Sequence, residues 1–216
     1  MYYIFTDIGK EAETMSKKIL RVNSSLFGNN GSSTQIIDNL VKQLADKLGE
    51  TNVVTRDFSK EPVPHLDGEW VSALMTPAAE KSAEQSAKTQ VSDTYIAEVV
   101  EADYIVIAAP MYNFNVPSML KAWFDHLARA GVTFKYTENG PVGLVDDKPV
   151  YVVTTRGGMH KGTDRDTEVQ FIRTFLAFIG LTQVEFIYAE GLNMQAHKEQ
   201  ALENAKEQVS QLVEAV

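Results

Sequence analysis

The sequence predicts an α/β protein in which helices cover both faces of a doubly wound, five-stranded parallel sheet. Five short apolar runs alternate with five longer runs whose apolar residues recur at helical spacing. The short runs are apolar almost throughout, as expected for a parallel sheet that is buried on both faces. The chain has 216 residues, of which 44% are hydrophobic, and this is enough for one sizeable core. We therefore expect the strand order 2-1-3-4-5.

The first half of the chain supplies two of the strands and two of the helices. Residues 19–23 and 53–58 are predicted to be strands because they are rich in aliphatic and β-branched side chains. Between them, apolar residues recur at helical spacing over 36–48, and the glycine that follows ends this helix. A long proline-containing stretch, 61–77, leads to a second helix with its apolar residues at 95–100.

The second half repeats the strand–helix pattern three times. Residues 104–109 form the most buried strand expected, Pro117 opens the third helix and Gly180 ends the fourth. The remaining predicted elements are a strand at 150–154, a helix at 171–179, a strand at 184–188 and a last helix at 202–213. Five such units are typical of the flavodoxin-like fold. A Rossmann fold is less favoured, because no Gly-x-Gly-x-x-Gly follows the first strand.

No internal repeat, low-complexity block or linker divides the chain, so we expect a single domain over residues 15–216. Residues 1–14 precede the first predicted strand and are expected to form a poorly ordered N-terminal extension, as chain termini usually do. Met15 is an alternative start site. An extra strand or a docking arm is the competing interpretation of this extension.

The composition excludes several classes of function. There is no cysteine, so the chain has no disulfide, no thiolate nucleophile and no cysteine-bound metal. The formal net charge of −9 argues against nucleic-acid binding, which needs a positive surface. The four histidines lack metal-binding spacing, and a P-loop is absent. No signal peptide or membrane-spanning segment is recognisable, and we expect a soluble cytoplasmic protein without a metal site.

The first candidate binding segment is the loop after the first strand. Ligands of doubly wound sheets bind beyond the carboxyl ends of the strands, where the strand order reverses. Residues 24–34 contain five Ser or Thr and two Gly. Hydroxyls and free backbone N–H groups at a helix N-terminus make an anion site that suits a phosphate. The alternative is that Ser32 or Ser33 only caps the helix.

The second candidate segment is the loop at 109–117, which two prolines stiffen. Met111, Tyr112 and Phe114 come directly after a buried strand, where exposed apolar groups are unfavourable unless something covers them. A planar aromatic ligand would account for them. The alternative is packing against a neighbouring loop or subunit, which these residues taken alone favour.

The third candidate segment is the loop after the fourth strand. Gly157 and Gly158 allow the backbone to approach a flat ligand closely. Arg156 either faces the carbonyl-rich edge of such a ligand or forms an ion pair elsewhere. His160 is a candidate general acid, although a lone histidine in a loop is more often a bystander.

The stretch 61–77 is too long for an ordinary connection between a strand and a helix. We expect it to border the binding site that the three loops form, and a surface excursion is the alternative.

Several short motifs, in order along the chain, resemble the FMN-dependent NADH azoreductase family, whose members are also described as NADH:quinone oxidoreductases. The main motif is Met111-Tyr112-Asn113-Phe114, preceded by Ala108-Ala109-Pro110. The others are residues 130–141, Arg156-Gly157-Gly158 with His160-Lys161, Phe178-Ile179-Gly180 and Ala189-Glu190-Gly191. The resemblance runs from about Met15 to the C-terminus.

The resemblance implies an FMN site made from the three loops. The implied phosphate loop comprises Ser25, Gly31, Ser32 and Ser33; the implied isoalloxazine loop comprises Met111, Tyr112, Asn113 and Phe114; the implied ring-edge loop comprises Thr155, Arg156, Gly157 and Gly158. Substrate contacts are implied for Tyr136 and Phe178, and core packing of a helix is the alternative for Phe178, which the sequence alone favours. We include His160 among the candidate substrate residues. Many relatives have Ser-x-Ser where this chain has Gly31-Ser32-Ser33, and Ser where it has Thr155.

The resemblance further implies a homodimer with FMN near the interface and a ping-pong reaction. NADH would give a hydride to N5 of FMN, and a quinone or an azo compound would then take two electrons at the same place. The competing function is that of a flavodoxin-type electron carrier, which passes single electrons to protein partners. The choice between NADH and NADPH stays open, because no Arg cluster for a 2′-phosphate can be identified.

Overall fold

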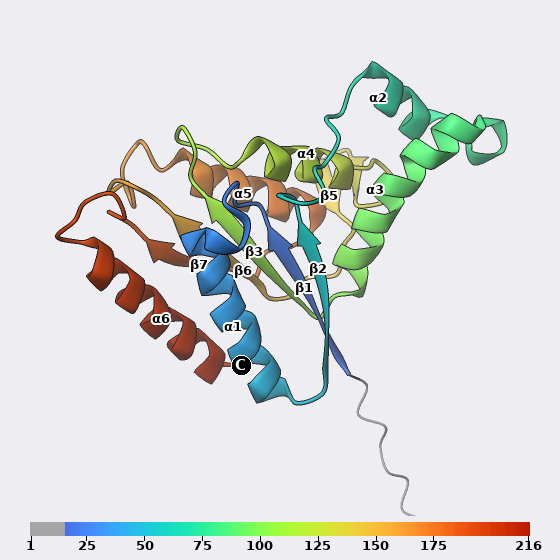
Figure 1. Ribbon diagram of the computed structural model, residues 1–216. Coiled ribbons are helices and arrows are strands. Elements are labelled where there is room, and N and C mark those ends of the chain that lie inside the picture. Colours follow the sequence, from blue (N-terminus) through green and yellow to red (C-terminus); the bar gives the residue numbers. More distant parts are fainter. Residues whose placement is uncertain (1–15) are drawn as a thin grey trace, which may run out of the picture.

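The computed structural model describes residues 16–216, so the predicted N-terminal extension, 1–14, lies outside the described residues. Five parallel strands form one sheet in the order β2-β1-β3-β6-β7 (Figure 1). Numbered among themselves, these strands have the predicted order 2-1-3-4-5. Their bounds are Lys17–Asn23 (β1), Thr51–Asp57 (β2), Tyr104–Pro110 (β3), Val150–Thr155 (β6) and Val184–Ala189 (β7).

Alternate residues of the strands pack into two separate hydrophobic clusters. In β3, Ile105 and Ile107 belong to a cluster with side chains from α3, α4 and α5. Val106 and Ala108 belong to a second cluster with side chains from α1 and α6. These helices are α1 (Ser32–Leu48), α3 (Ala83–Glu101), α4 (Ser118–Leu127), α5 (Thr167–Ile179) and α6 (Lys198–Glu214). The division follows from the two-residue repeat of a strand, which points successive side chains to opposite faces.

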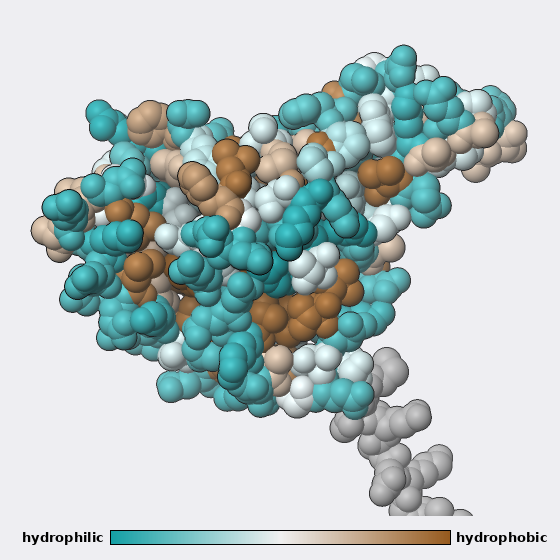
Figure 2. Space-filling model, viewed as in Figure 1, coloured by the Kyte–Doolittle hydropathy of each residue, from teal (hydrophilic) through white to brown (hydrophobic). Residues whose placement is uncertain are grey.

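The outer surfaces of α1 and α6 are mostly hydrophilic, and hydrophobic residues show between and beside them (Figure 2). Each helix therefore buries one apolar stripe against the sheet, as the helical spacing predicted. The glycine stops are confirmed for α1 and α5, since Gly49 and Gly180 both have positive φ, at 83° and 113°. No helix in the described part of the chain is long and apolar enough to cross a membrane.

Two features were not predicted. The stretch 61–77 contains a helix, α2 (Gly68–Met75), whose first turn is capped by Asp67. The Asp67 carboxylate accepts from the N–H groups of Glu69 and Trp70, each at 3.0 Å. Together with the start of α3, α2 projects from the body of the molecule (Figure 1). Short 3-10 turns lie at Gly28–Asn30 (η1) and Ala78–Glu80 (η2).

The second unpredicted feature is a two-stranded antiparallel hairpin, β4 (Phe134–Thr137) and β5 (Gly140–Gly143). It lies between α4 and β6 in the sequence and packs against the end of α5. Val145 N–H donates to the carbonyl of Ile179 at 3.0 Å. Gly143 approaches the backbone of Gly180 so closely that a Cβ at Gly143 would collide with it.

Candidate functional site

The carboxyl ends of β1, β3 and β6 bring the three candidate loops to one edge of the sheet, around a cavity of about 270 Å³. Nine predicted residues line it: Ser25, Gly31, Ser32, Ser33, Met111, Tyr112, Thr155, Arg156 and Gly157. Five further residues line it: Phe27 and Pro110, which belong to the first two candidate segments, and Leu192, Asn193 and Lys198, which were not predicted. Three of these follow β7, a segment for which the composition gave no ligand signal.

The first loop ends at the N-terminus of α1, which has features of an anion site. Its N-cap is Gly31, there is no side-chain cap, and the first turn holds no acidic residue. Ser33 is 1% exposed, and its Oγ has no hydrogen-bond partner among the described residues. An unpaired buried hydroxyl is unfavourable unless something else binds it. The hydroxyl, the free N–H groups and the positive end of the helix dipole together suit a phosphate.

Asn23, the last residue of β1, holds this loop in shape. Its Oδ1 accepts from the Ser25 N–H at 3.1 Å and from the Thr34 hydroxyl at 2.9 Å. Its Nδ2 donates to Asp57 at the end of β2, at 3.1 Å. A Cβ at Gly31 would collide with the Ser25 hydroxyl. The loop is therefore a closely packed cradle in which glycine is required.

The second loop closes in a tight turn. Tyr112 and Asn115 exchange two backbone hydrogen bonds, at 2.9 and 3.2 Å. The two residues between them, Asn113 and Phe114, both have left-handed φ values, 51° and 66°. Such a turn favours Asn or Gly, so Phe114 is strained there. The carbonyl of Phe114 accepts from the Thr167 hydroxyl at the start of α5, which ties the turn to the rest of the chain.

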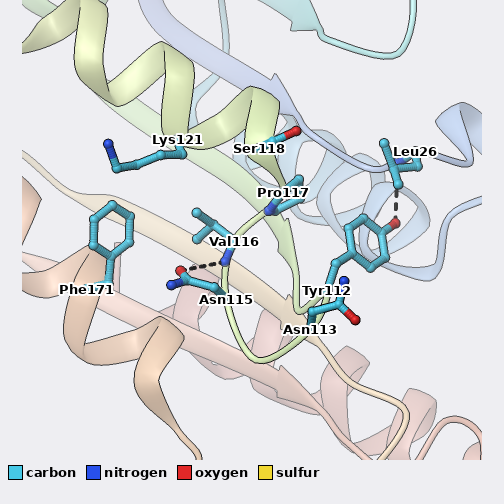
Figure 3. A pocket seen from close by; sticks show the side chains of 9 residues that line it. All are labelled: Leu26, Tyr112, Asn113, Asn115, Val116, Pro117, Ser118, Lys121 and Phe171. Carbon is cyan, nitrogen blue, oxygen red and sulfur yellow. Dashed lines mark hydrogen bonds between the residues drawn. The ribbon is translucent and has the colours of Figure 1, made fainter. Parts of the chain in front are cut away.

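Tyr112 also lines a second cavity of about 460 Å³ (Figure 3). Its hydroxyl accepts from the Leu26 N–H at 3.3 Å, and the side chain points toward Leu26 in the figure. The full lining comprises Leu26, Tyr112, Asn113, Asn115, Val116, Pro117, Ser118, Lys121 and Phe171. Tyr112 thus stands between a cavity rich in donors and a more apolar one, and Asn113 contributes to the second cavity only.

The third loop is held by its carbonyl groups. The carbonyls of Arg156, Gly157 and Gly158 accept from the N–H groups of residues 192, 193 and 191, at 3.0, 3.1 and 2.9 Å. The N–H groups of Gly157 and Gly158 donate to no group among the described residues. The loop therefore keeps two backbone donors available beside the cavity, although Gly158 itself does not line it.

Arg156 reaches the cavity only through its backbone. Its guanidinium is fully buried and forms ion pairs with Asp166 at 2.5 Å, Glu190 at 3.3 Å and Glu168 at 3.4 Å. Of the two interpretations of Arg156, the structure supports the ion pair. Burial raises the pKa of Glu168 to about 7, against the opposing effects of the Thr154 hydroxyl and of Arg156.

The predicted substrate residues lie outside both cavities. His160 contacts Phe114 edge-on, with ring centroids 5.6 Å apart. Tyr136 is exposed on β4 and contacts Phe134, which in turn packs against Phe178 at 4.2 Å between ring centroids. Tyr136 and Phe178 therefore share one aromatic group on the hairpin side of the molecule. Among the described residues, no group of three or more His, Asp or Glu is arranged to hold a metal.

Helix α2 is anchored to the body through the buried His126. The ring Nε2 of His126 lies 2.9 Å from the Pro64 carbonyl, and the Trp70 ring contacts it edge-on at 4.9 Å between centroids. Burial lowers the pKa of His126, so the ring is neutral and belongs to the structural support of α2.

Comparison with known proteins agrees with the fold and the motifs. Residues 17–213 match the family described as having a flavodoxin-like fold. The FMN-dependent NADH:quinone oxidoreductase of Cellvibrio japonicus is 52% identical over 197 residues, covering 91% of this chain and 98% of that protein. The protein of the same name from Saccharophagus degradans is 48% identical and covers 94% of this chain and 96% of its own length.

A solved structure gives the same result. An azoreductase from Bacillus anthracis superposes with a TM-score of 0.84 at 25% identity, covering 93% of this chain and 100% of that one. The resemblance found in the motifs is therefore confirmed over almost the whole described chain. The chain belongs to the flavodoxin-like fold family and, within it, to the FMN-dependent NADH:quinone oxidoreductases.

Proposed function

We propose that this chain is an FMN-dependent NADH:quinone oxidoreductase that also reduces azo compounds. The strongest support from the structure is the set of unpaired donors around the first cavity: the Ser33 hydroxyl and the uncapped first turn of α1 on one side, and the N–H groups of Gly157 and Gly158 on the other. These groups fit a ligand with a phosphate at one end and a carbonyl-rich ring at the other.

The donor set assigns parts of FMN to parts of the chain. Ser25, Gly31, Ser32 and Ser33 would hold the phosphate, with the helix dipole of α1 favouring its charge. The backbone of residues 155–158 would face the ring edge and stabilise negative charge there, since free N–H groups in a water-poor site act as an oxyanion-type site. Met111 and Tyr112 would contact the flat ring. When bound, FMN supplies the two-electron chemistry, accepting hydride from NADH and passing electrons to the acceptor.

The second cavity, on the other side of Tyr112, is suited to bind substrates. Its lining includes the apolar residues Val116, Pro117 and Phe171, together with the polar residues Lys121 and Asn115. This cavity would receive the nicotinamide of NADH first and the acceptor afterwards. Tyr136, Phe178 and His160 would contribute to acceptor binding, and the projecting segment with α2 would border the site.

We further propose that two copies of the chain form a homodimer, with FMN near the interface. Leu26, Phe27 and Phe114 support this, because they are 59%, 68% and 51% exposed around the two cavities. Large exposed apolar groups gathered at one site are typical of surfaces that another molecule covers.

The doubly wound arrangement, with helices on both faces of one domain over residues 15–216, is supported by the two core clusters. A cytoplasmic location stays a prediction.

One assay tests the activity. The protein is purified, loaded with FMN and mixed without oxygen with NADH, then with a quinone or an azo dye. We expect the flavin absorbance to bleach with NADH and to return with the acceptor over many turnovers. A flavodoxin-type carrier would bind FMN but bleach poorly with NADH and turn over little. Failure to bind FMN would contradict the proposal as a whole.

A further inference from the structure

Beneath the third loop lies a buried cluster of one cation and three carboxylates. Arg156, which follows β6, is surrounded by Asp166 and Glu168 at the start of α5 and by Glu190 after β7. Arg156 and Glu168 have fully buried side chains, and those of Asp166 and Glu190 are 12% and 9% exposed. With all four groups ionised the cluster would carry two net negative charges, which is unfavourable away from water.

Glu168 differs from the other two carboxylates in its bonding. Glu190 also accepts from the N–H groups of His160 and Lys161, each at 2.7 Å, and Asp166 makes the shortest ion pair to Arg156. Glu168 Oε2 accepts from the Thr154 hydroxyl at 2.7 Å, whereas its Oε1 has no hydrogen-bond partner among the described residues. A buried carboxylate oxygen without a donor is better accommodated when it carries a proton.

The cluster lies directly behind the proposed flavin site. Thr155 and the backbone of Arg156 line the first cavity. Their neighbour Thr154 and the Arg156 side chain are the groups that Glu168 contacts on the opposite side. Lys161 and Arg173 also lie near this cluster: the Lys161 Nζ is 4.2 Å from the centre of the Tyr188 ring, against which Arg156 also packs, and the charge of Arg173 acts on Tyr188 as well. A change of charge in the cavity therefore acts on Glu168 across the buried residues Thr154 and Arg156.

On the basis of the proposed function, we propose that Glu168 is a proton-holding residue that offsets the charge arriving with each hydride. A hydride brings two electrons and one proton, so its transfer to the cavity adds one negative charge. Glu168 then binds a proton from solvent in a larger fraction of the molecules, converting more of its carboxylate to the neutral acid. When the acceptor removes the hydride and takes up a further proton, the charge leaves and Glu168 releases its proton to solvent. No bond to Glu168 other than its O–H forms or breaks.

The size of the effect can be estimated. Two unit charges about 10 Å apart, at an effective permittivity of about 20, shift a pKa by roughly one unit. Since the pKa of Glu168 is already raised to about 7, such a shift changes its protonated fraction by several tenths at neutral pH. Asp166 and Glu190 are more strongly paired with donors and are expected to stay ionised in both states.

The test counts the protons bound per two electrons. FMN-loaded wild type and Glu168→Gln are reduced by NADH at pH 7 in weak buffer with a pH-indicator dye, and the midpoint potential is measured from pH 6 to pH 8. We expect wild type to take up several tenths of a proton more than Glu168→Gln, with a steeper dependence of potential on pH. Asp164→Asn, which removes an exposed acid from the same loop, should behave as wild type.

A second measurement needs no variant. Infrared difference spectra of wild type on reduction should show a gain in the C=O band of a protonated carboxyl, and this band should shift when glutamate alone carries ¹³C. Equal proton uptake in wild type and Glu168→Gln, or no glutamate band, would overturn the inference while FMN binding and reduction remain intact. A chain that does not bind or reduce FMN would instead contradict the proposed function.

Discussion

Asn193 occupies the space that a side chain on Gly157 would need. A Cβ built at Gly157 collides with the Asn193 amide nitrogen, and the Asn193 N–H donates to the Gly157 carbonyl at 3.1 Å. The segment after β7 thus supports the third loop from behind and fixes where its free N–H groups lie. The two residues are 36 positions apart in the sequence, and only the parallel pairing of β6 with β7 brings them together.

Replacing Gly157 with Val should therefore weaken FMN binding. The branched side chain pushes against Asn193 and moves the loop, and overpacking of this kind costs about 1–3 kcal/mol. We expect the Kd for FMN, measured by quenching of flavin fluorescence, to rise about tenfold or more. Gly68→Val is the matched control, because a Cβ at Gly68 meets nothing within 4 Å. Unchanged affinity and potential in Gly157→Val would contradict the assigned role of this loop.

Ser33→Ala should separate ligand binding from stability. The Ser33 hydroxyl has no partner within the described protein, so its removal should leave the free energy of unfolding of the apoprotein equal or slightly higher. A hydrogen bond to a charged group contributes about 1.5–3 kcal/mol, so the affinity for FMN should fall about tenfold or more. Isothermal titration with FMN and urea unfolding of the apoprotein measure the two quantities.

The opposite result is expected for Ser92→Ala, which serves as the control. Ser92 is equally buried, but its hydroxyl donates to the His126 carbonyl at 2.6 Å and accepts from Arg129 at 3.1 Å. Its loss should destabilise the fold by about 1–3 kcal/mol and leave FMN affinity unchanged. If both variants lost stability alike, Ser33 would be an ordinary structural serine.

Lys198→Ala should weaken FMN binding in a way that depends on salt. Lys198 lines the cavity from the first residue of α6 and is exposed. An exposed charge pair contributes about 0.2–1 kcal/mol, so we expect the Kd to rise about two- to fivefold at low ionic strength. The difference should shrink in 0.5 M salt because exposed charges are screened over about 4 Å there. Lys206→Ala on the same helix should have no effect, and a salt-independent loss would indicate altered packing instead.

Glu168 should lower the stability of the protein as the pH rises from about 4.5 to about 7. Its folded-state pKa is raised to about 7 from an ordinary value of 4.5, so the folded state binds more protons between these two values. The carboxyl therefore causes no loss below about pH 4.5, and its cost grows to about 3 kcal/mol above pH 7. The free energies of unfolding of wild type and Glu168→Gln, measured in urea, should converge below about pH 4.5, diverge in favour of the variant between about pH 4.5 and 7, and keep a constant difference above that range. Parallel curves would contradict this assignment.

Gly143→Ala should destabilise the hairpin that carries Tyr136. The added Cβ would collide with the backbone of Gly180, which cannot yield as a side-chain tip can, and the expected cost is about 2 kcal/mol or more. Gly68→Ala, at a position where an added Cβ meets nothing, should change the free energy of unfolding little. Limited proteolysis would report whether the hairpin opens locally, and quinone turnover would show whether its position shapes the acceptor site. Unaltered turnover in a chain with an opened hairpin would argue against that role for Tyr136.

The sheet and most helices could be predicted because their signals are local. Strand runs such as 104–109 and helix stops such as Gly49 and Gly180 depend on hydrophobic period and on backbone preference. The three loops followed from the rule for ligand position in doubly wound sheets. Helix α2 carried a local signal that was not used: Asp67 precedes an apolar run and caps it, as an N-cap residue does.

Other features depend on contacts that no local pattern reveals. Leu192, Asn193 and Lys198 reach the cavity because β7 lies beside β6, and they carry no motif of their own. Arg156 could not be assigned from its position next to two glycines, because its three acidic partners come from two other segments, the start of α5 and the residue after β7. The hairpin at 134–143 is short and largely exposed, so it has neither the length nor the alternation of a core strand.

The way α1 presents its N-terminus has a consequence for the working range of the protein. Its anion-binding groups are main-chain amides and serine hydroxyls, none of which gains or loses a proton between pH 5 and pH 9. Retention of a phosphate-bearing cofactor should then follow the ionisation of the phosphate itself, whose second pKa is near 6, with the protein contributing an almost constant affinity. The charge of the buried groups can therefore change during turnover while the affinity for the cofactor stays nearly constant.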